Sequence, residues 1–432
     1  MDFKKIKDNS VVIGVIGLGY VGLPLALEYG KKVKVIGFDT NKERISNLRN
    51  KLDTNNETSS NEILSSNKCV FTEILEDLNV CDVFIITVPT PIDKYKRPDI
   101  EVLLNATTSV AQIMKSGSVV IFESTVYPGT TEEECVPKLS AVSQLKYKKD
   151  FHVGYSPERI NPGDKSNTFS SIKKLTSGCD DKTLEFVDML YNLVITAGTH
   201  KCSSIKVAEA SKALENIQRD VNIGLMNEVT QIFDALKIPV HEVLKACSSK
   251  WNFLNFEPGL VGGHCIGIDP YYLAHKAIEM EASPDIILAA RKCNDGMSNF
   301  LVEKIIDEIL IKKCIPSDFK ILLIGYAFKE NCSDFRNTRV YDLAQLLSEK
   351  NINVDIYDPI IDIKNAKLTA KNINFIEVIR NNFYDLGVLT VPHDIFLNDQ
   401  ASMINNSIKN NGALFDIKNK WKYSSNLKIL KL

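Results

Sequence analysis

Long apolar runs are what this sequence most clearly lacks. No stretch approaches the roughly 20 apolar residues that span a bilayer, and residues 1–5 show no signal-peptide pattern. A surplus of one charge is also missing, because the net charge is -2 with acidic and basic residues interspersed. Bulk charge therefore argues against nucleic acid or a membrane as a partner, and we expect a cytoplasmic protein.

Metal-binding spacings are absent as well. The ten cysteines include no CxxC pair, and the six histidines include no HExxH motif. We therefore expect no metal site and, without an export signal, cysteines that stay reduced. The chain has 432 residues, of which 44% are hydrophobic, so it has material for roughly two to four domains with large cores.

Strand-like and helix-like segments alternate in the N-terminal part. A helix is predicted over 20–29, whereas 51–67 is polar and predicts a loop or a weak helix start. Short apolar strand candidates recur at 11–17, 33–39, 82–89 and 118–123. Such alternation favours a parallel sheet that is covered on both faces.

A glycine-rich turn follows the first predicted strand. Residues 17–22, Gly-Leu-Gly-Tyr-Val-Gly, match GxGxxG between a strand and a helix. Gly17 suits the tight turn, Gly19 lets the backbone approach a pyrophosphate, and Gly22 allows the helix to pack. The second strand ends at Asp39, where an acidic residue accepts ribose hydroxyls. The pattern predicts a dinucleotide site, with a turn that binds nothing as the alternative.

The acidic residue and two further strand ends refine this prediction. Asp39 favours NAD over NADP, because a carboxylate repels a 2′-phosphate. Arg44 either weakens that preference or packs on the adenosine as a planar cation. Segments 88–91 and 123–125 lie at the carboxyl edge of the sheet, where ligands bind in open α/β folds. The expected cofactor contacts there are Pro89, Thr90, Ser124 and Thr125.

The middle of the chain has helical periodicity. Apolar residues recur at helical spacing from about 203 to 233 (Leu214, Ile217, Val221 and Leu225). Thirty residues make a helix of about 45 Å, and helices of that length usually connect domains or form oligomer interfaces. We therefore expect a homodimer through this helix. More apolar helical sequence follows at 284–311.

Strands return in the C-terminal part on the same plan. Residues 319–325 and 352–358 resemble the first two strands, and 385–392 ends in Thr-Val-Pro as 82–89 does. We predict two Rossmann-like doubly wound parallel-sheet α/β domains, joined by the long central helix and a helical middle domain. The predicted boundaries are 1–202, 203–312 and 313–432.

A cysteine lies in a glycine-rich loop of the middle part. Residues 262–270 read Gly-Gly-His-Cys-Ile-Gly-Ile-Asp-Pro, so Cys265 follows two glycines and Asp269 comes four residues later. Glycines let the backbone approach a ligand closely, and a thiol there can attack a carbonyl and hold the product as a thioester. The alternative is a buried, inert cysteine. His264 is not expected to be the base, because adjacent side chains usually point apart.

Further motifs are spread along the chain: Ser-Thr-Val-Tyr-Pro-Gly-Thr-Thr at 124–131, Ser-Pro-Glu-Arg at 156–159, Lys-Ala-Leu-Glu-Asn at 212–216, Arg-Asp-Val-Asn-Ile at 219–223, Phe-Lys-Glu-Asn at 328–331 and Asp-Phe-Arg-Asn at 334–337. With the glycine turn and the cysteine loop, in this order, the chain resembles the UDP-glucose/GDP-mannose dehydrogenase family over nearly its whole length. Residues 157–163 and 259–272 are most similar to the UDP-N-acetylhexosamine 6-dehydrogenases. The UDP-glucose branch commonly carries a second glutamate where this chain has Pro162.

The resemblance implies an activity. It is the NAD-dependent four-electron oxidation of C6 of UDP-N-acetylglucosamine or UDP-N-acetylgalactosamine to the uronic acid, for bacterial surface polysaccharides. UDP-glucose or UDP-N-acetylmannosamine as substrate, and a two-electron β-hydroxyacid-type dehydrogenase, are the alternatives. The sequence does not decide the C4 epimer, because one hydrogen bond can do so.

The resemblance also implies roles for individual residues. Cys265 would add to the aldehyde, Lys212 would stabilise oxyanions, and Asn216 would position water or the alkoxide. Asp269 is either a general base or a residue that caps the next helix. Glu158 and Thr125 match positions near the nicotinamide and the water. The substrate set is Glu158, Arg159, Lys212, Asn216, Phe256, Gly259, Gly262 and Lys329; Arg336 would reach toward NAD, with Tyr20 and Val21 in the cofactor turn.

Overall fold

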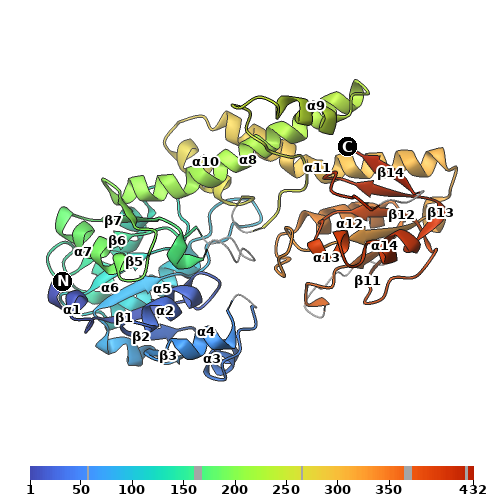
Figure 1. The fold of residues 1–432 in the computed structure, drawn as a ribbon. Coiled ribbons are helices and arrows are strands. Elements are labelled where there is room, and N and C mark those ends of the chain that lie inside the picture. Colours follow the sequence, from blue (N-terminus) through green and yellow to red (C-terminus); the bar gives the residue numbers. More distant parts are fainter. Residues whose placement is uncertain (56–57, 160–167, 264–265, 364–371, 424–426) are drawn as a thin grey trace. The chain divides into compact units, whose positions relative to one another are not determined.

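Figure 1 shows the computed structural model of the chain, which describes residues 1–55, 58–159, 168–263, 266–363, 372–423 and 427–432. These residues divide into two units, Met1–Glu215 with Tyr271–Ser283 and Asn216–Pro270 with Pro284–Leu432. The division falls inside helices α8 (Ile205–Ala235) and α10 (Asp269–Glu279). The three-part boundaries at 202 and 312 stay a prediction from sequence pattern.

The first unit contains an eight-stranded sheet in the order β3-β2-β1-β4-β5-β6-β7-β8. Its strands are β1 (Val12–Ile16), β2 (Lys34–Phe38), β3 (Cys69–Thr72), β4 (Val83–Ile86), β5 (Val119–Phe122), β6 (His152–Tyr155), β7 (Lys174–Gly178) and β8 (Thr199–Lys201). Neighbouring strands are parallel from β3 to β6, and β7 is antiparallel to β6. The first six strands follow the doubly wound order, which switches direction between β1 and β4.

Helices cover both faces of this sheet (Figure 1). They are α1 (Phe3–Lys7), α2 (Gly22–Gly30), α3 (Lys42–Arg49), α4 (Ser60–Ser65), α5 (Glu101–Ile113), α6 (Val136–Ser143) and α7 (Asp181–Asn192), with short turns η1 (Leu75–Val80), η2 (Thr131–Cys135) and η3 (Phe169–Ser171). The polar stretch at 51–67 contains α4, which begins at a capping box formed by Ser59 and Glu62.

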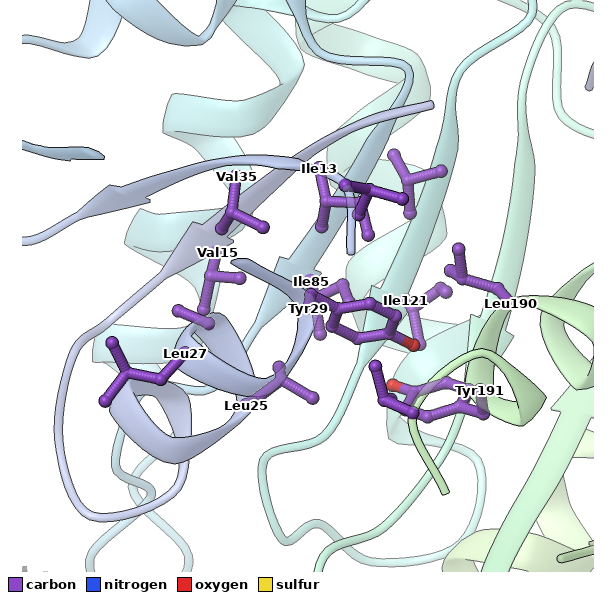
Figure 2. Close-up of a cluster of buried hydrophobic side chains, with 14 of the residues drawn as sticks. Ile13, Val15, Leu25, Leu27, Tyr29, Val35, Ile85, Ile121, Leu190 and Tyr191 are labelled. Atoms are coloured by element: carbon purple, nitrogen blue, oxygen red, sulfur yellow. The ribbon is translucent and has the colours of Figure 1, made fainter. Parts of the chain in front are cut away.

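Each face of the sheet has its own hydrophobic core. Side chains of α2 and α7 pack on one face, and those of α5 and α6 pack on the other. Figure 2 shows part of the first core, with Ile13, Val15, Val35, Ile85 and Ile121 of the strands against Leu25, Leu27, Tyr29, Leu190 and Tyr191. Full burial of one such aliphatic side chain contributes about 1.5–3 kcal/mol to folding stability. The two cores therefore hold the strands, and with them the strand ends, in fixed positions.

The second unit contains a six-stranded parallel sheet in the order β11-β10-β9-β12-β13-β14. Its strands are β9 (Lys320–Ile324), β10 (Asn353–Tyr357), β11 (Ile373–Phe375), β12 (Tyr384–Leu389), β13 (Ile408–Asp416) and β14 (Lys428–Lys431). Its helices are α9 (Val240–Cys247), α11 (Asp285–Ile311), α12 (Arg339–Glu349), α13 (Asp394–Leu397) and α14 (Ala401–Ser407), with turn η4 (Pro316–Asp318) and most of α8. The order is again the doubly wound one, and helices cover both of its faces.

The turn after β1 in the first sheet and the turn after β9 in the second have the same local structure. Gly17 after β1 has φ 91° and Gly325 after β9 has φ 94°. Thr87 Oγ1 donates to the carbonyls of residues 16 and 17, at 3.0 and 2.7 Å. Thr390 Oγ1 donates to the carbonyls of residues 324 and 325, at 2.9 and 2.5 Å. The second α/β domain therefore follows the plan of the first, as the Thr-Val-Pro repeat predicted.

The central helix is also present. Helix α8 has 31 residues, close to the predicted 203–233, and α11 has 27 and covers the predicted 284–311. Within the part of the chain that the structure describes, no helix is both long and apolar enough to cross a membrane.

Candidate active site

The glycine turn after β1 leaves room for a ligand beside its backbone. A Cβ on Gly22 would lie 1.9 Å from the carbonyl oxygen of Gly17, so no side chain fits there. No atom lies within 4 Å of where a Cβ of Gly19 would be. A pyrophosphate can therefore approach the backbone at Gly19, at the start of α2.

Two polar side chains support this turn. Asp39 Oδ2 accepts a hydrogen bond from the Leu18 backbone N–H at 2.9 Å. Arg44 is buried, and its Nε donates to the Leu18 carbonyl at 3.0 Å while Nη1 pairs with Asp53 at 2.5 Å. Its Nη2 is buried and has no hydrogen-bond partner among the described residues. The open glycine cradle and this unpartnered donor fit a dinucleotide; the assigned roles of Asp39 and Arg44 stay predictions.

The ends of β4 and β5 are tied to each other. Thr90 Oγ1 donates to the Thr125 carbonyl at 2.6 Å, and Ser124 Oγ donates to the Val88 carbonyl at 2.6 Å. The structure thus brings the predicted cofactor residues of these two strand ends together at the carboxyl edge of the sheet. Pro89 lies in the loop after β4, and Tyr20 and Val21 lie in the glycine turn between β1 and α2; all three stay predicted cofactor contacts.

Glu158 follows β6 at the same edge and is 5% exposed. Its carbonyl oxygen accepts a hydrogen bond from Lys212 Nζ at 2.8 Å. Its Oε1 accepts one from the Arg159 backbone N–H at 2.6 Å. The Arg159 guanidinium donates to the Lys212 carbonyl at 3.4 Å and pairs with Glu215. Three predicted site residues, 158, 159 and 212, therefore form one hydrogen-bonded group.

A buried lysine that the sequence analysis missed holds the Glu158 carboxylate. Lys174 at the start of β7 is 3% exposed, and its Nζ pairs with Glu158 Oε2 at 2.5 Å and with Glu123 Oε2 at 2.9 Å. The Tyr191 hydroxyl donates to the other oxygen of Glu123. One ammonium therefore serves two buried carboxylates.

The charges in this cluster shift one another. Burial lowers the pKa of Lys174, but the carboxylates of Glu123 and Glu158 outweigh burial and raise that pKa overall. Burial raises the pKa of Glu123, and Lys174 offsets that rise only in part. The ammonium therefore stays charged at neutral pH and keeps Glu158 in place as its counter-ion.

In the second unit, Asn216 and Asp269 are joined. Both are buried, and Asn216 Nδ2 donates to Asp269 Oδ2, while an Arg219 guanidinium nitrogen donates to Asn216 Oδ1. Asp269 is the first residue of α10. The two predicted catalytic residues thus come together although 53 positions separate them. Whether Asp269 acts as a base stays a prediction.

The loop that leads to the cysteine is closely packed. A Cβ on Gly262 would lie 2.6 Å from the carbonyl oxygen of Asn337, and one on Gly263 would lie 2.7 Å from the Phe328 ring. Gly263 has φ 86°, in the left-handed region that favours glycine. Both glycines are therefore required for packing. His264 and Cys265 lie outside the described residues.

A buried amide network fixes the start of this loop, and the sequence analysis missed it. Asn227 on α8 donates to the Gly259 carbonyl at 3.0 Å and accepts from its N–H at 2.8 Å. Asn227 also donates to Asn294 on α11 at 2.8 Å. Asn294 in turn donates to Asp220, which pairs with Arg291. In the sequence, the only sign of this network was that polar residues occupy helix positions that are buried.

Three predicted ligand contacts lie on loops of the second unit. Arg336 is exposed and pairs with Asp334 at 2.7 Å. Lys329 Nζ lies 5.6 Å from the centre of the Phe328 ring. Phe256 is partly exposed. Their assignments to NAD or to substrate stay predictions.

Comparison with known proteins shows which family the sequence matches. Three family models match the chain: the NAD binding domain of the UDP-glucose/GDP-mannose dehydrogenase family at residues 11–195, its central domain at 206–296 and its UDP binding domain at 322–423.

Similar proteins of full length are also known. The chain is 50% identical over 410 residues to a UDP-N-acetyl-D-glucosamine 6-dehydrogenase of Pseudomonas aeruginosa, covering 95% of this chain and 97% of that one. A Salmonella typhi protein of the same name is 47% identical over 410 residues, covering 95% and 96%. Among solved structures, UDP-D-ManNAc dehydrogenase of Pyrococcus horikoshii superposes with a TM-score of 0.86 at 28% identity, covering 98% and 99%.

Proposed function

Because the chain belongs to the UDP-glucose/GDP-mannose dehydrogenase family and is an NAD-dependent nucleotide-sugar dehydrogenase, we propose that its substrate is UDP-N-acetylglucosamine. The observation that carries this proposal is the 50% identity, over nearly both full lengths, to a UDP-N-acetyl-D-glucosamine 6-dehydrogenase. The N-acetylmannosamine enzyme of similar structure is only 28% identical. UDP-N-acetylgalactosamine is the second candidate, and it differs at one hydroxyl.

The proposed reaction oxidises C6 twice. Each oxidation removes a hydride from C6 and a proton from its oxygen, and NAD⁺, when bound, would supply the hydride acceptor, so two NAD⁺ would be consumed. After the first, the Cys265 thiolate adds to the aldehyde carbon, and the carbonyl oxygen takes up a proton to give a thiohemiacetal. After the second, the bond between sulfur and C6 is a thioester. Water breaks that bond, and the carboxylate and the thiol are released. Covalent attachment keeps the reactive aldehyde on the enzyme.

Contacts within each unit support the roles that we propose for Lys212, Asn216 and Asp269. Lys212 is 6% exposed, and its ammonium is held by the Glu158 carbonyl, which suits a fixed charge that stabilises an oxyanion at C6. Asn216 lies one helical turn further along α8 and bonds Asp269. We propose that this pair positions the water or the alkoxide, and that Asp269 accepts the proton.

A substrate panel tests the choice of sugar. With NADH formation as the readout, we expect the highest kcat/KM for UDP-N-acetylglucosamine. UDP-glucose lacks the acetamido group, so the polar groups that bind it stay unpaired, and we expect its kcat/KM to be at least roughly tenfold lower. UDP-N-acetylgalactosamine and UDP-N-acetylmannosamine complete the panel. A higher kcat/KM for any of these three sugars contradicts the proposal.

We also propose that the active form is a homodimer through α8. Leu214, Leu225 and Ile232 are 60%, 52% and 47% exposed, and their spacing of 11 and 7 residues places them on one stripe of the helix. An exposed apolar stripe of this kind usually marks an interface. A second copy of the chain, which carries the same stripe, is the occupant that we propose.

The mass in solution tests the dimer. We expect the wild-type protein to sediment as a dimer at micromolar concentration and Leu225→Glu to shift it toward the monomer. Leu254→Glu is the matched control, since Leu254 is as exposed (61%) but lies outside α8. A wild-type monomer, or equal effects of the two variants, contradicts the proposed interface.

The proposal includes the cytoplasm as the location, because the Cys265 thiol has to stay reduced for catalysis. The product, a nucleotide-linked uronic acid, is a building block of bacterial surface polysaccharides such as capsule or O-antigen. A deletion strain that retains its full acidic surface polysaccharide would argue against this use.

A further inference from the structure

Three potential metal ligands from separate parts of the sequence meet at one end of β6 and β7. His152 begins β6, Cys179 follows β7, and Asp180 is the N-cap of α7. Their ligand atoms lie within 4.8 Å of one another. The expectation of no metal site rested on short sequence spacings, and 27 positions separate the histidine from the cysteine.

The three candidate ligand atoms are spaced nearly as the ligands of one cation are, and the Thr183 hydroxyl lies beside them, 3.3 Å from His152 Nδ1 and 3.5 Å from Cys179 Sγ. His152 Nδ1 lies 3.6 Å from Asp180 Oδ2, and Cys179 Sγ lies 3.8 Å from that oxygen and 4.0 Å from Nδ1. An N···O separation of 3.6 Å is too long for a hydrogen bond. Ligands of a tetrahedral zinc ion, at its usual bond lengths, are roughly 3.4–3.6 Å apart. If the three atoms move closer together by a few tenths of an ångström, their separations match those of zinc ligands.

The surrounding structure aims these atoms at one point. Asp180 Oδ1 accepts from the Thr183 N–H and hydroxyl, each at 2.7 Å, which leaves Oδ2 to face the other two ligands. The Cys179 N–H donates to the Val153 carbonyl at 2.9 Å. The ligands are thus held by a helix cap and by the sheet, so binding needs little reorganisation.

We propose that His152, Cys179 and Asp180 bind a zinc-type divalent cation. A thiolate and an imidazole favour Zn²⁺ over Mg²⁺ or Ca²⁺, which prefer oxygen ligands. Three protein ligands leave the fourth tetrahedral position to water.

The position of this cluster points to a stabilising role. It lies where β6 begins and β7 ends, whereas Glu158 follows the other end of β6 and Lys174 begins β7. A cation there joins β6 to the β7–α7 junction. It lies at the opposite edge of the sheet from Glu158 and the glycine turn, so we expect it to raise stability without changing kcat.

Cobalt binding tests the site directly. Titration of the reduced, metal-free full-length protein with CoCl₂ is expected to produce a thiolate-to-cobalt absorption band in the near ultraviolet, saturating at one equivalent per chain. Cys179→Ser is expected to abolish this band, and His152→Ala is expected to weaken binding by at least about tenfold. Cys314→Ser, which alters an exposed thiol elsewhere, and Cys265→Ser are expected to retain it.

A thermal measurement separates the site from nonspecific binding. ZnCl₂ is expected to raise the unfolding midpoint of the wild-type protein and of Cys314→Ser, but not of Cys179→Ser or His152→Ala. NADH formation by the two site variants is expected to match the wild type, which also shows that they fold. A cobalt band that persists in Cys179→Ser, or a wild-type midpoint that does not respond to zinc, overturns the proposal.

Discussion

Replacing Cys265 with serine is expected to lower net uronate formation by roughly 10³-fold or more, because the essential nucleophile is lost. A serine hydroxyl stays protonated near neutral pH and does not capture the aldehyde as a thiolate does. The glycine turn that we assign to NAD lies in the first unit, whereas residue 265 lies between described segments of the second. Cofactor affinity is expected to stay within about twofold of wild type, because the proposed role of the Cys265 thiol is to attach the sugar carbon and not to bind NAD.

The measurement pairs product formation with cofactor binding. Uronate and NADH are followed in the steady state, and NAD affinity is measured by calorimetry. Cys314→Ser is the matched control, because Cys314 is an exposed thiol in the same unit, and it is expected to retain wild-type activity. Uronate formation by Cys265→Ser at the wild-type rate would contradict covalent catalysis, whereas loss of NAD binding would point to a structural effect.

Replacing Lys174 with methionine is expected to destabilise the first unit by about 3–5 kcal/mol, because the ammonium that pairs with two buried carboxylates is lost. Glu158 is also expected to move. Its carbonyl holds Lys212, so kcat is expected to fall roughly tenfold to a hundredfold. Denaturant unfolding and NADH kinetics measure the two effects.

The loss of stability caused by Lys174→Met is expected to depend on pH. Burial already raises the pKa of Glu123 in the folded protein, and without the Lys174 ammonium that pKa is expected to rise further. Such a group costs stability as pH rises above its unfolded pKa, ordinarily about 4.3, so the loss of stability is smaller near pH 4–5 than at neutral pH.

Lys201→Met is the matched control, since Lys201 pairs with Glu185 on the surface, where the two side chains are 41% and 58% exposed. The control is expected to cost less than about 1 kcal/mol at any pH. Equal losses of stability in Lys174→Met and Lys201→Met would contradict the role of the buried cluster. A loss in Lys174→Met that grows toward acid pH would also contradict it.

Local patterns account for what the sequence predicted well. The turn at 17–22 lies between β1 and α2, because glycine spacing and strand ends are read within a few residues. The repeat of Thr-Val-Pro predicted the second sheet for the same reason. Helix α8 followed from apolar periodicity alone.

Long-range pairing explains what the sequence did not predict. Lys174 pairs with Glu123 and Glu158 because β7 runs antiparallel to β6, and no local sequence pattern predicts that reversal of direction. Asn227 is a similar case, since its partner Gly259 lies 32 residues away on a loop. Family resemblance placed Asn216 and Asp269 in the site, and their mutual hydrogen bond required the fold.

The stoichiometry of NADH formation tests the central claim most directly. With a limiting amount of UDP-N-acetylglucosamine and excess NAD⁺, the reaction taken to completion is expected to yield about two NADH per sugar, with the uronic acid as product and no free aldehyde. A yield of about one NADH per sugar, with an aldehyde or ketone as product, would contradict a four-electron oxidation through Cys265.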